Sequence, residues 1–172
     1  VHVKARLPWL LVLMCSYVFT GGMIASFEAS LSAVIALVAY MPMLMGTGGN
    51  SGTQSSTVII TGMATGALEL SDILKVLWKE FRIGIIVGIC VSVLNYFRIV
   101  LFDHNGSLVA LTVCFSMVLI VVIAKCIGAL LPMIAKKIGI DPALIAGPMM
   151  ASLTDMVALG TYFTMARIVL KI

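Results

Sequence analysis

Long apolar stretches, separated by short clusters of charged residues, dominate the chain. Such a stretch can cross a hydrocarbon core about 30 Å thick as a helix. The stretches run continuously, without the alternation of apolar and polar residues typical of membrane β-strands. The pattern therefore predicts an all-α membrane protein with five transmembrane helices per subunit, at residues 7–27, 30–66, 81–102, 108–135 and 142–170.

Composition supports a multi-pass protein of the cell (plasma) membrane, with membrane lipid as its surroundings. Of the 172 residues, 62% are hydrophobic and 10% are charged, whereas soluble domains carry about 25% charged residues. The net charge of +4 comes from basic residues near the segment ends, where membrane orientation requires them, so nucleic acid is not an expected partner. Their distribution predicts a cytoplasmic N-terminus, an extracytoplasmic C-terminus and a cytoplasmic loop over residues 69–82.

The second apolar stretch has a run of glycines and small polar residues in its middle. In hydrocarbon, irregular backbone survives only where it is buried in protein or lines a water-filled cavity. The run therefore predicts that the second helix is broken and that its neutral oxygens and amides line a cavity suited to a hydrated cation. The residues expected to line it are Gly46, Gly48, Gly49, Asn50, Thr53 and Gln54. The alternative is that these small residues only pack helices together.

Asp155 lies deep inside the fifth stretch, where a carboxylate is costly and usually functional. On a continuous helix, Gly147, Ala151 and Asp155 recur every four residues and share one face. The small side chains leave room in front of the carboxylate for a hydrated ion, and Thr154 can add a polar contact. The alternative is that Asp155 neutralises Lys125, which lies near the middle of the preceding stretch.

The chain carries no phosphate-binding loop, dinucleotide fingerprint, zinc-ligand cluster or Ser/His/Asp set placed for hydrolysis. An enzyme is therefore not expected.

Two sequence segments stand out: residues 42–54 read PMLMGTGGNSGTQ, and a second segment runs from Asp141-Pro142 through Pro148 to Asp155. Both resemble segments of the MgtE family of magnesium channels. The resemblance implies a homodimer whose pore lies on the two-fold axis, between the second and fifth helices of each subunit. It also implies a cytosolic N-terminal domain and paired CBS domains upstream of this membrane domain.

Carried over by residue, the resemblance places the pore carboxylate at Asp155, with Ala151 and Gly147 also facing the ion. Paired Asp155 side chains would hold a hydrated Mg²⁺, the transported ion, during passive uptake, and other divalent cations are further candidates. Gly147 and Lys125 depart from the family pattern, which has a polar and a neutral residue there. A Na⁺- or H⁺-coupled secondary divalent-cation transporter and a purely structural membrane subunit remain alternatives.

Overall fold

A computed structural model describes residues 2–171 except 29–31, 33, 104–105 and 146. Within this part of the chain the protein is helical and has no strand. The long helices are α1 His2–Ser26, α3 Ala36–Ala64, α4 Ile73–Arg98, α5 Ser107–Lys137 and α7 Pro148–Leu170. Three short elements join them, namely the 3-10 turn η1 Leu70–Asp72, the π-helical turn η2 Ile99–Asp103 and the helix α6 Pro142–Ile145. The predicted all-α fold is confirmed.

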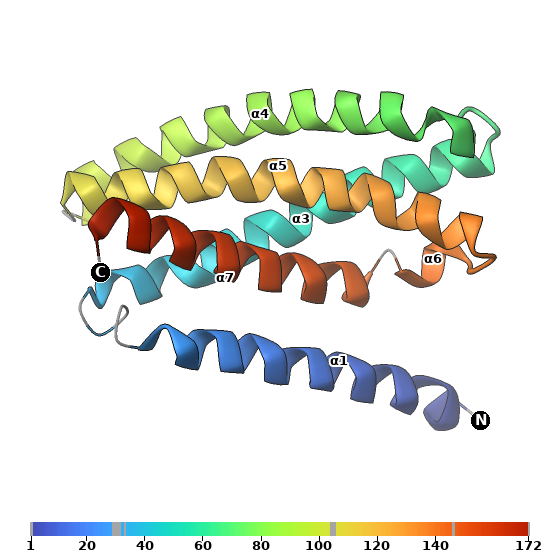
Figure 1. Ribbon diagram of the computed structural model, residues 1–172, viewed down its shortest axis with the longest axis horizontal. Coiled ribbons are helices and arrows are strands. Elements are labelled where there is room, and N and C mark those ends of the chain that lie inside the picture. Colours follow the sequence, from blue (N-terminus) through green and yellow to red (C-terminus); the bar gives the residue numbers. More distant parts are fainter. Residues whose placement is uncertain (1, 29–31, 33, 104–105, 146, 172) are drawn as a thin grey trace.

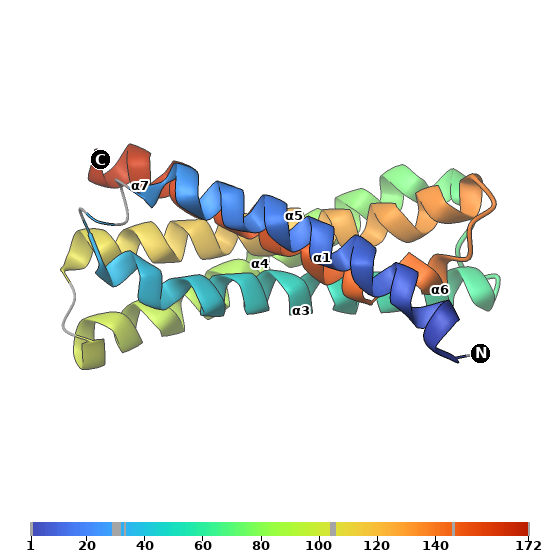
Figure 2. The ribbon, with the colours of Figure 1, turned by 90° about the horizontal axis from the view of Figure 1, so that it is seen from below.

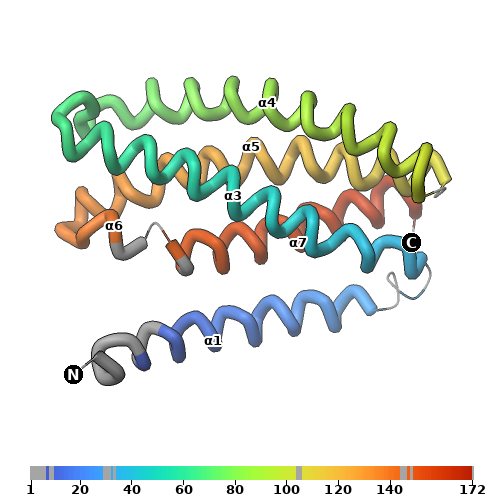
Figure 3. The backbone as a smooth tube through the Cα atoms, turned by 180° about the vertical axis from the view of Figure 1, so that it is seen from behind, coloured from blue at the N-terminus to red at the C-terminus, as the bar shows by residue number. Residues whose placement is uncertain are grey.

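The long helices form a bundle around α5 (Figure 1). Helix α5 packs against α3, α4 and α7, and α3 also packs against α7. Helix α1 lies at one edge of the bundle, where it contacts α7, and α4 lies at the opposite edge (Figures 1 and 2). The chain enters and leaves at opposite ends of the bundle (Figure 3).

Three helical segments are long and apolar enough to cross a membrane: Leu70–Asp103, Ser107–Lys137 and Met149–Leu170. Helix α1 has a shorter apolar stretch, Leu10–Ser26. Charged residues are few in the middle of these segments, so hydrocarbon can surround the surface that the neighbouring helices leave uncovered. These findings support a multi-pass membrane protein.

The expected break in the second helix is wrong. Helix α3 continues without interruption from Ala36 to Ala64 and includes Pro42. Two threonine hydroxyl groups are satisfied within the helix: Thr47 donates to the Met43 carbonyl at 2.7 Å, and Thr57 donates to the Thr53 carbonyl at 2.9 Å. The glycines remain helical because packing against neighbouring helices compensates their low intrinsic helix propensity.

The break lies in the fifth segment instead. Helix α6 ends at Ile145 and α7 begins at Pro148, with Gly147 as its non-helical N-cap. Proline lacks an N–H group and disfavours helical geometry in the residue before it. Asp141 caps the short α6, because its carboxylate accepts a hydrogen bond from the Ala143 N–H at 2.9 Å. The predicted span 142–170 is therefore two helices.

A close backbone contact fixes the crossing of α3 and α5. Gly52 and Gly128 meet there, and a Cβ atom added at Gly128 would collide with the Gly52 carbonyl oxygen. A Cβ atom added at Gly52 would lie 3.2 Å from the Ala124 carbonyl oxygen and 3.0 Å from the Thr154 methyl group. Small residues at such crossings let membrane helices approach closely. Gly52 is consequently the point where α3, α5 and α7 come together.

A polar cluster joins the other end of α3 to the end of α4. The Tyr40 hydroxyl donates to Asp103 at 2.9 Å, and the Arg98 guanidinium lies 3.1 Å from the same carboxylate. Arg98 also donates to the Asn95 side-chain oxygen at 3.0 Å. Because the π-helical turn η2 ends at Asp103, it brings that carboxylate to Tyr40. The cluster links α3 to η2 and to the end of α4 at this end of the bundle.

The glycine crossing yields a stability prediction. We expect Gly128→Ala to destabilise the protein by about 1–3 kcal/mol, because the added methyl group overpacks the backbone contact with α3. The matched control is Gly22→Ala in α1, where an added Cβ meets nothing within 4 Å. Thermal unfolding of both variants in the same detergent tests this. Equal melting temperatures for the two would contradict the role of the crossing.

Candidate functional site

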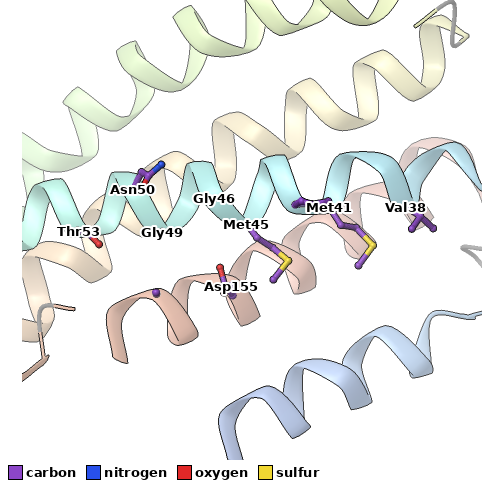
Figure 4. Close-up of a pocket in the computed structure, with 10 residues that line it drawn as sticks. Val38, Met41, Met45, Gly46, Gly49, Asn50, Thr53 and Asp155 are labelled. Atoms are coloured by element: carbon purple, nitrogen blue, oxygen red, sulfur yellow. The ribbon is translucent and has the colours of Figure 1, made fainter. Parts of the chain in front are cut away.

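An open pocket of about 600 Å³ lies between α3 and α7 (Figure 4). It brings together six of the ten residues singled out from the sequence: Gly46, Gly49, Asn50, Thr53, Ala151 and Asp155. The remaining lining residues are Val38, Met41, Pro42 and Met45. Residues of α3 spaced three or four apart share one face of the helix, and that face forms one wall of the pocket.

The α3 wall changes in character along its length. Towards the start of the helix it presents the apolar side chains of Val38, Met41 and Met45 (Figure 4). Further along, the glycines leave the backbone uncovered, and then Asn50 and Thr53 present an amide and a hydroxyl. Such groups donate and accept hydrogen bonds without carrying net charge. The polar half of the pocket can therefore contact water or a hydrated ion.

Asp155 projects from α7 towards this wall (Figure 4). Its side chain is half-buried, and it makes no hydrogen bond or ion pair with any residue in the described part of the chain. Ala151 lies one turn earlier on α7 and lines the same pocket. The described residues contain no group of three or more His, Cys, Asp and Glu side chains placed to hold a metal. One chain thus presents a single unpaired carboxylate here.

Two of the singled-out residues lie between helices instead of in the pocket. Gly48 is buried, and a Cβ atom added to it would lie 2.9 Å from the Ile120 side chain of α5. Thr154 is fully buried, and its hydroxyl lies 2.9 Å from the carbonyl oxygens of Met150 and Ala151. Both residues therefore pack the helices that carry the pocket.

The other two lie outside it on exposed surface. Gln54 lines an adjoining hollow of about 630 Å³, together with Asn50, Thr53, Thr57 and Val58. This hollow continues the polar side of α3 beyond the first pocket. Gly147 is exposed at the N-cap of α7 and lines neither hollow.

Lys125 does not pair with Asp155. Its ammonium group lies 3.8 Å from a Glu80 carboxylate oxygen and 3.4 Å from the Ser55 hydroxyl. Ser55 in turn donates to Glu80 at 2.5 Å. The three side chains come from α5, α4 and α3, and all three are buried. The structure therefore supplies Lys125 with a different acidic partner.

Glu80 was missed by sequence reasoning, which placed residues 69–82 in a cytoplasmic loop. Helix α4 begins at Ile73, so Glu80 lies inside a helix. Its buried face repeats every four residues through Glu80, Gly84, Gly88 and Ser92. Gly84 and Gly88 meet the α5 backbone closely, so the whole stripe faces α5. This four-residue spacing of small residues with Glu80 is visible in the sequence and indicates that Glu80 points towards a neighbouring helix.

Comparison with known proteins gives the family. The family model described as "MgtE: Divalent cation transporter" matches residues 41–165. The chain belongs to the MgtE family. The matched region contains every residue that lines the pocket except Val38, and so includes the α3 run and Asp155.

Curated MgtE relatives align with nearly the whole chain. It is 40% identical over 167 residues to the protein named magnesium transporter MgtE of Thermus thermophilus, covering 97% of this chain and 37% of the relative. It is 35% identical over 161 residues to the protein of that name in Bacillus subtilis, covering 94% and 36%. The Enterococcus faecalis relative, also so named, is 28% identical over 166 residues, covering 96% and 36%. The chain thus spans a little over a third of the length of these relatives.

The polar half of the pocket yields an accessibility prediction. We expect Asn50→Cys and Thr53→Cys, in a protein whose four native cysteines are replaced by serine, to react with a charged thiol reagent in the membrane. Reaction requires the thiolate, which forms in water and not in hydrocarbon. The rates should exceed those of two controls by about tenfold or more.

The controls are Ser56→Cys, which is fully buried, and Phe115→Cys, on the exposed apolar surface of α5. Reaction rates followed by mass spectrometry distinguish the cases. Similar rates at Thr53 and Phe115 would mean that the pocket is not wetted.

Proposed function

We propose that this chain forms the membrane part of a Mg²⁺ channel that mediates passive magnesium uptake across the plasma membrane. The observation that carries the proposal is the unpaired carboxylate of Asp155, half-buried on a helix apolar enough to span the membrane. Such a charge is costly in a membrane unless water, a counter-charge or an ion accompanies it. A passing cation supplies the missing positive charge.

The proposed pore lies at the axis of a homodimer. Support comes from the open shape of the pocket and from the single carboxylate that one chain presents there. A second copy related by a two-fold axis would place another Asp155 opposite the first. Mg²⁺ dehydrates reluctantly, so two carboxylates can hold its bound waters and select the ion by its hydrated size.

The remaining pocket groups have proposed roles along the path. Asn50, Thr53 and Gln54 offer neutral hydrogen-bonding groups that can exchange with the outer waters of the ion. The backbone near Ala151 lies one turn from the carboxylate and offers further oxygens. Gly147, at the N-cap before α7, would lie nearer one mouth of the pore.

We further propose five spans, with α1 and α3 crossing alongside the three more apolar helices. In that arrangement the N-terminus is cytoplasmic and the C-terminus extracytoplasmic, as the excess of basic residues on one side favours. A regulatory cytosolic N-terminal domain with paired CBS domains would precede this membrane domain in the full protein.

The alternative of a Na⁺- or H⁺-coupled transporter depended on a pair of Lys125 and Asp155 that exchanges partners with protons or Na⁺. Lys125 is paired with Glu80 instead, at a distance of 3.8 Å between nitrogen and oxygen. That observation removes the specific support for the coupled mechanism and leaves the passive pore as the simpler function.

Flux measurements test the channel. We expect the protein in proteoliposomes to pass Mg²⁺ with Mg²⁺ as the only gradient and the membrane potential clamped. Asp155→Asn should reduce the flux by about tenfold or more, because it removes the charge that attracts a divalent ion. The matched control is Asp141→Asn, which keeps an N-capping side chain outside the pocket and should retain parent flux.

Two outcomes would contradict the proposal. Flux that requires an added proton or Na⁺ gradient would establish a coupled transporter. Parent-level flux in Asp155→Asn would remove Asp155 from the ion path.

A further inference from the structure

We infer that Glu80 is an electrostatic positioning residue for ion passage: it cancels the positive charge of Lys125, which would otherwise repel a divalent cation at the Asp155 site. The inference rests on the proposed channel function and concerns residues outside the pocket. Its structural basis is the buried cluster of Lys125, Ser55 and Glu80, in which three helices each contribute one side chain.

Burial and direct contacts join the three side chains of the cluster. Glu80 and Lys125 side chains are each 7% exposed, so little solvent screens either charge. Ser55 lies between them, with its hydroxyl 2.5 Å from the Glu80 carboxylate and 3.4 Å from the Lys125 ammonium group. The hydroxyl can donate only to the carboxylate, so its oxygen is left to accept from the ammonium group. The arrangement stabilises both charges together.

The cluster lies at the depth of Asp155. Gly52 of α3 faces both the Ala124 carbonyl of α5 and the Thr154 side chain of α7. Lys125 directly follows Ala124 in the sequence, and Asp155 directly follows Thr154. The two charged residues therefore occupy the same level of the bundle.

Helix α3 separates the cluster from the pocket. Thr53 lines the pocket and Ser55 faces Lys125 and Glu80. Two residues along an α-helix correspond to a rotation of about 200°, so these side chains lie on opposite faces. The distance across the helix is about 10 Å. Protein rather than mobile salt fills that distance, so a net charge on one face acts strongly on the other.

The valence of the ion makes this charge important. The repulsion between Lys125 and a cation grows in proportion to the charge of the cation, so Mg²⁺ is affected twice as strongly as a monovalent ion. With Glu80 ionised beside it, the pair has no net charge, and only a weaker dipole remains. Glu80 thus makes a lysine at this depth compatible with a path for divalent cations.

Stabilisation of the fold is by itself a weak explanation for the presence of a buried Lys125–Glu80 pair. Buried ion pairs are often no more stabilising than apolar side chains of similar volume, whereas removal of one partner is harmful. An effect on the ion is distinguishable from an effect on folding. If the cluster acts on the ion, Mg²⁺ flux should vary with the net charge of the cluster. If it acts only on folding, flux should fall whenever its packing and hydrogen bonds are weakened, whatever the net charge.

The experiment compares Glu80→Gln, Lys125→Met and the double variant in proteoliposomes, with equal amounts of folded protein verified by gel filtration and melting temperature. Glu80→Gln is measured at mildly acidic pH, which favours a protonated Lys125, and Lys125→Met at mildly alkaline pH, which favours an ionised Glu80. The parent and the double variant are measured at both pH values. We expect Glu80→Gln to lower Mg²⁺ flux roughly tenfold, because Lys125 is left uncompensated. The double variant should return to within about twofold of the parent, because its cluster is neutral. Lys125→Met should pass Mg²⁺ at least as fast as the parent.

Other outcomes overturn the inference. Parent-level flux in Glu80→Gln would show that the Lys125 charge is not felt in the pore. Flux lost in all three variants, without recovery in the double variant, would indicate a purely structural pair. If Glu80→Gln does not fold, the decisive comparison is Lys125→Met against the double variant: the extra negative charge should raise flux about threefold, and equal flux contradicts the inference.

The parent and Asp155→Asn are measured in the same series. Absence of passive Mg²⁺ flux in the parent, or full flux in Asp155→Asn, refutes the proposed channel and this inference with it. A large effect of Asp155→Asn combined with no effect of Glu80→Gln refutes the inference alone.

Discussion

The close approach of α3 and α5 at Gly52 and Gly128 is the constraint on which the rest of the arrangement depends. With no side chain on either glycine, the two backbones touch, and this contact fixes how α3 is rotated about its axis. Gly48 then faces Ile120, one turn earlier on the same side. The opposite face of α3, with Asn50 and Thr53, is left to line the pocket.

Two carboxylates within the helical bundle have contrasting environments. Glu80 has a lysine and a serine as partners and is buried, whereas Asp155 has no partner among the described residues and is half-buried beside an open pocket. A buried charge must be compensated within the protein, but an accessible one can be compensated by water or an ion. In this fold Glu80 is therefore compensated by protein groups, whereas Asp155 remains accessible to water or an ion.

Much of the fold could be predicted from hydrophobic pattern alone. The expected span 108–135 lies within α5, and Asp155 was recognisable because a carboxylate in an apolar stretch is unusual. The glycine run in α3 led to the wrong prediction of a helix break, because small residues occur both at helix breaks and where two helices cross closely. The true break lies at Gly147-Pro148, where the proline disfavours helical geometry in the residue before it. The pairing of Lys125 could not be predicted, because sequence spacing does not show which helices are neighbours or how they are rotated.

The two-sided character of α3 has a consequence for how the protein is made. Helices α4, α5 and α7 are apolar enough to partition into lipid individually, but α3 does not belong to this group because polar groups cover part of its surface. Its main packing partners, α5 and α7, emerge from the ribosome after it. If α3 spans the membrane as proposed, its stable residence in the bilayer awaits helices synthesised later, and the order of assembly then differs from the order of translation.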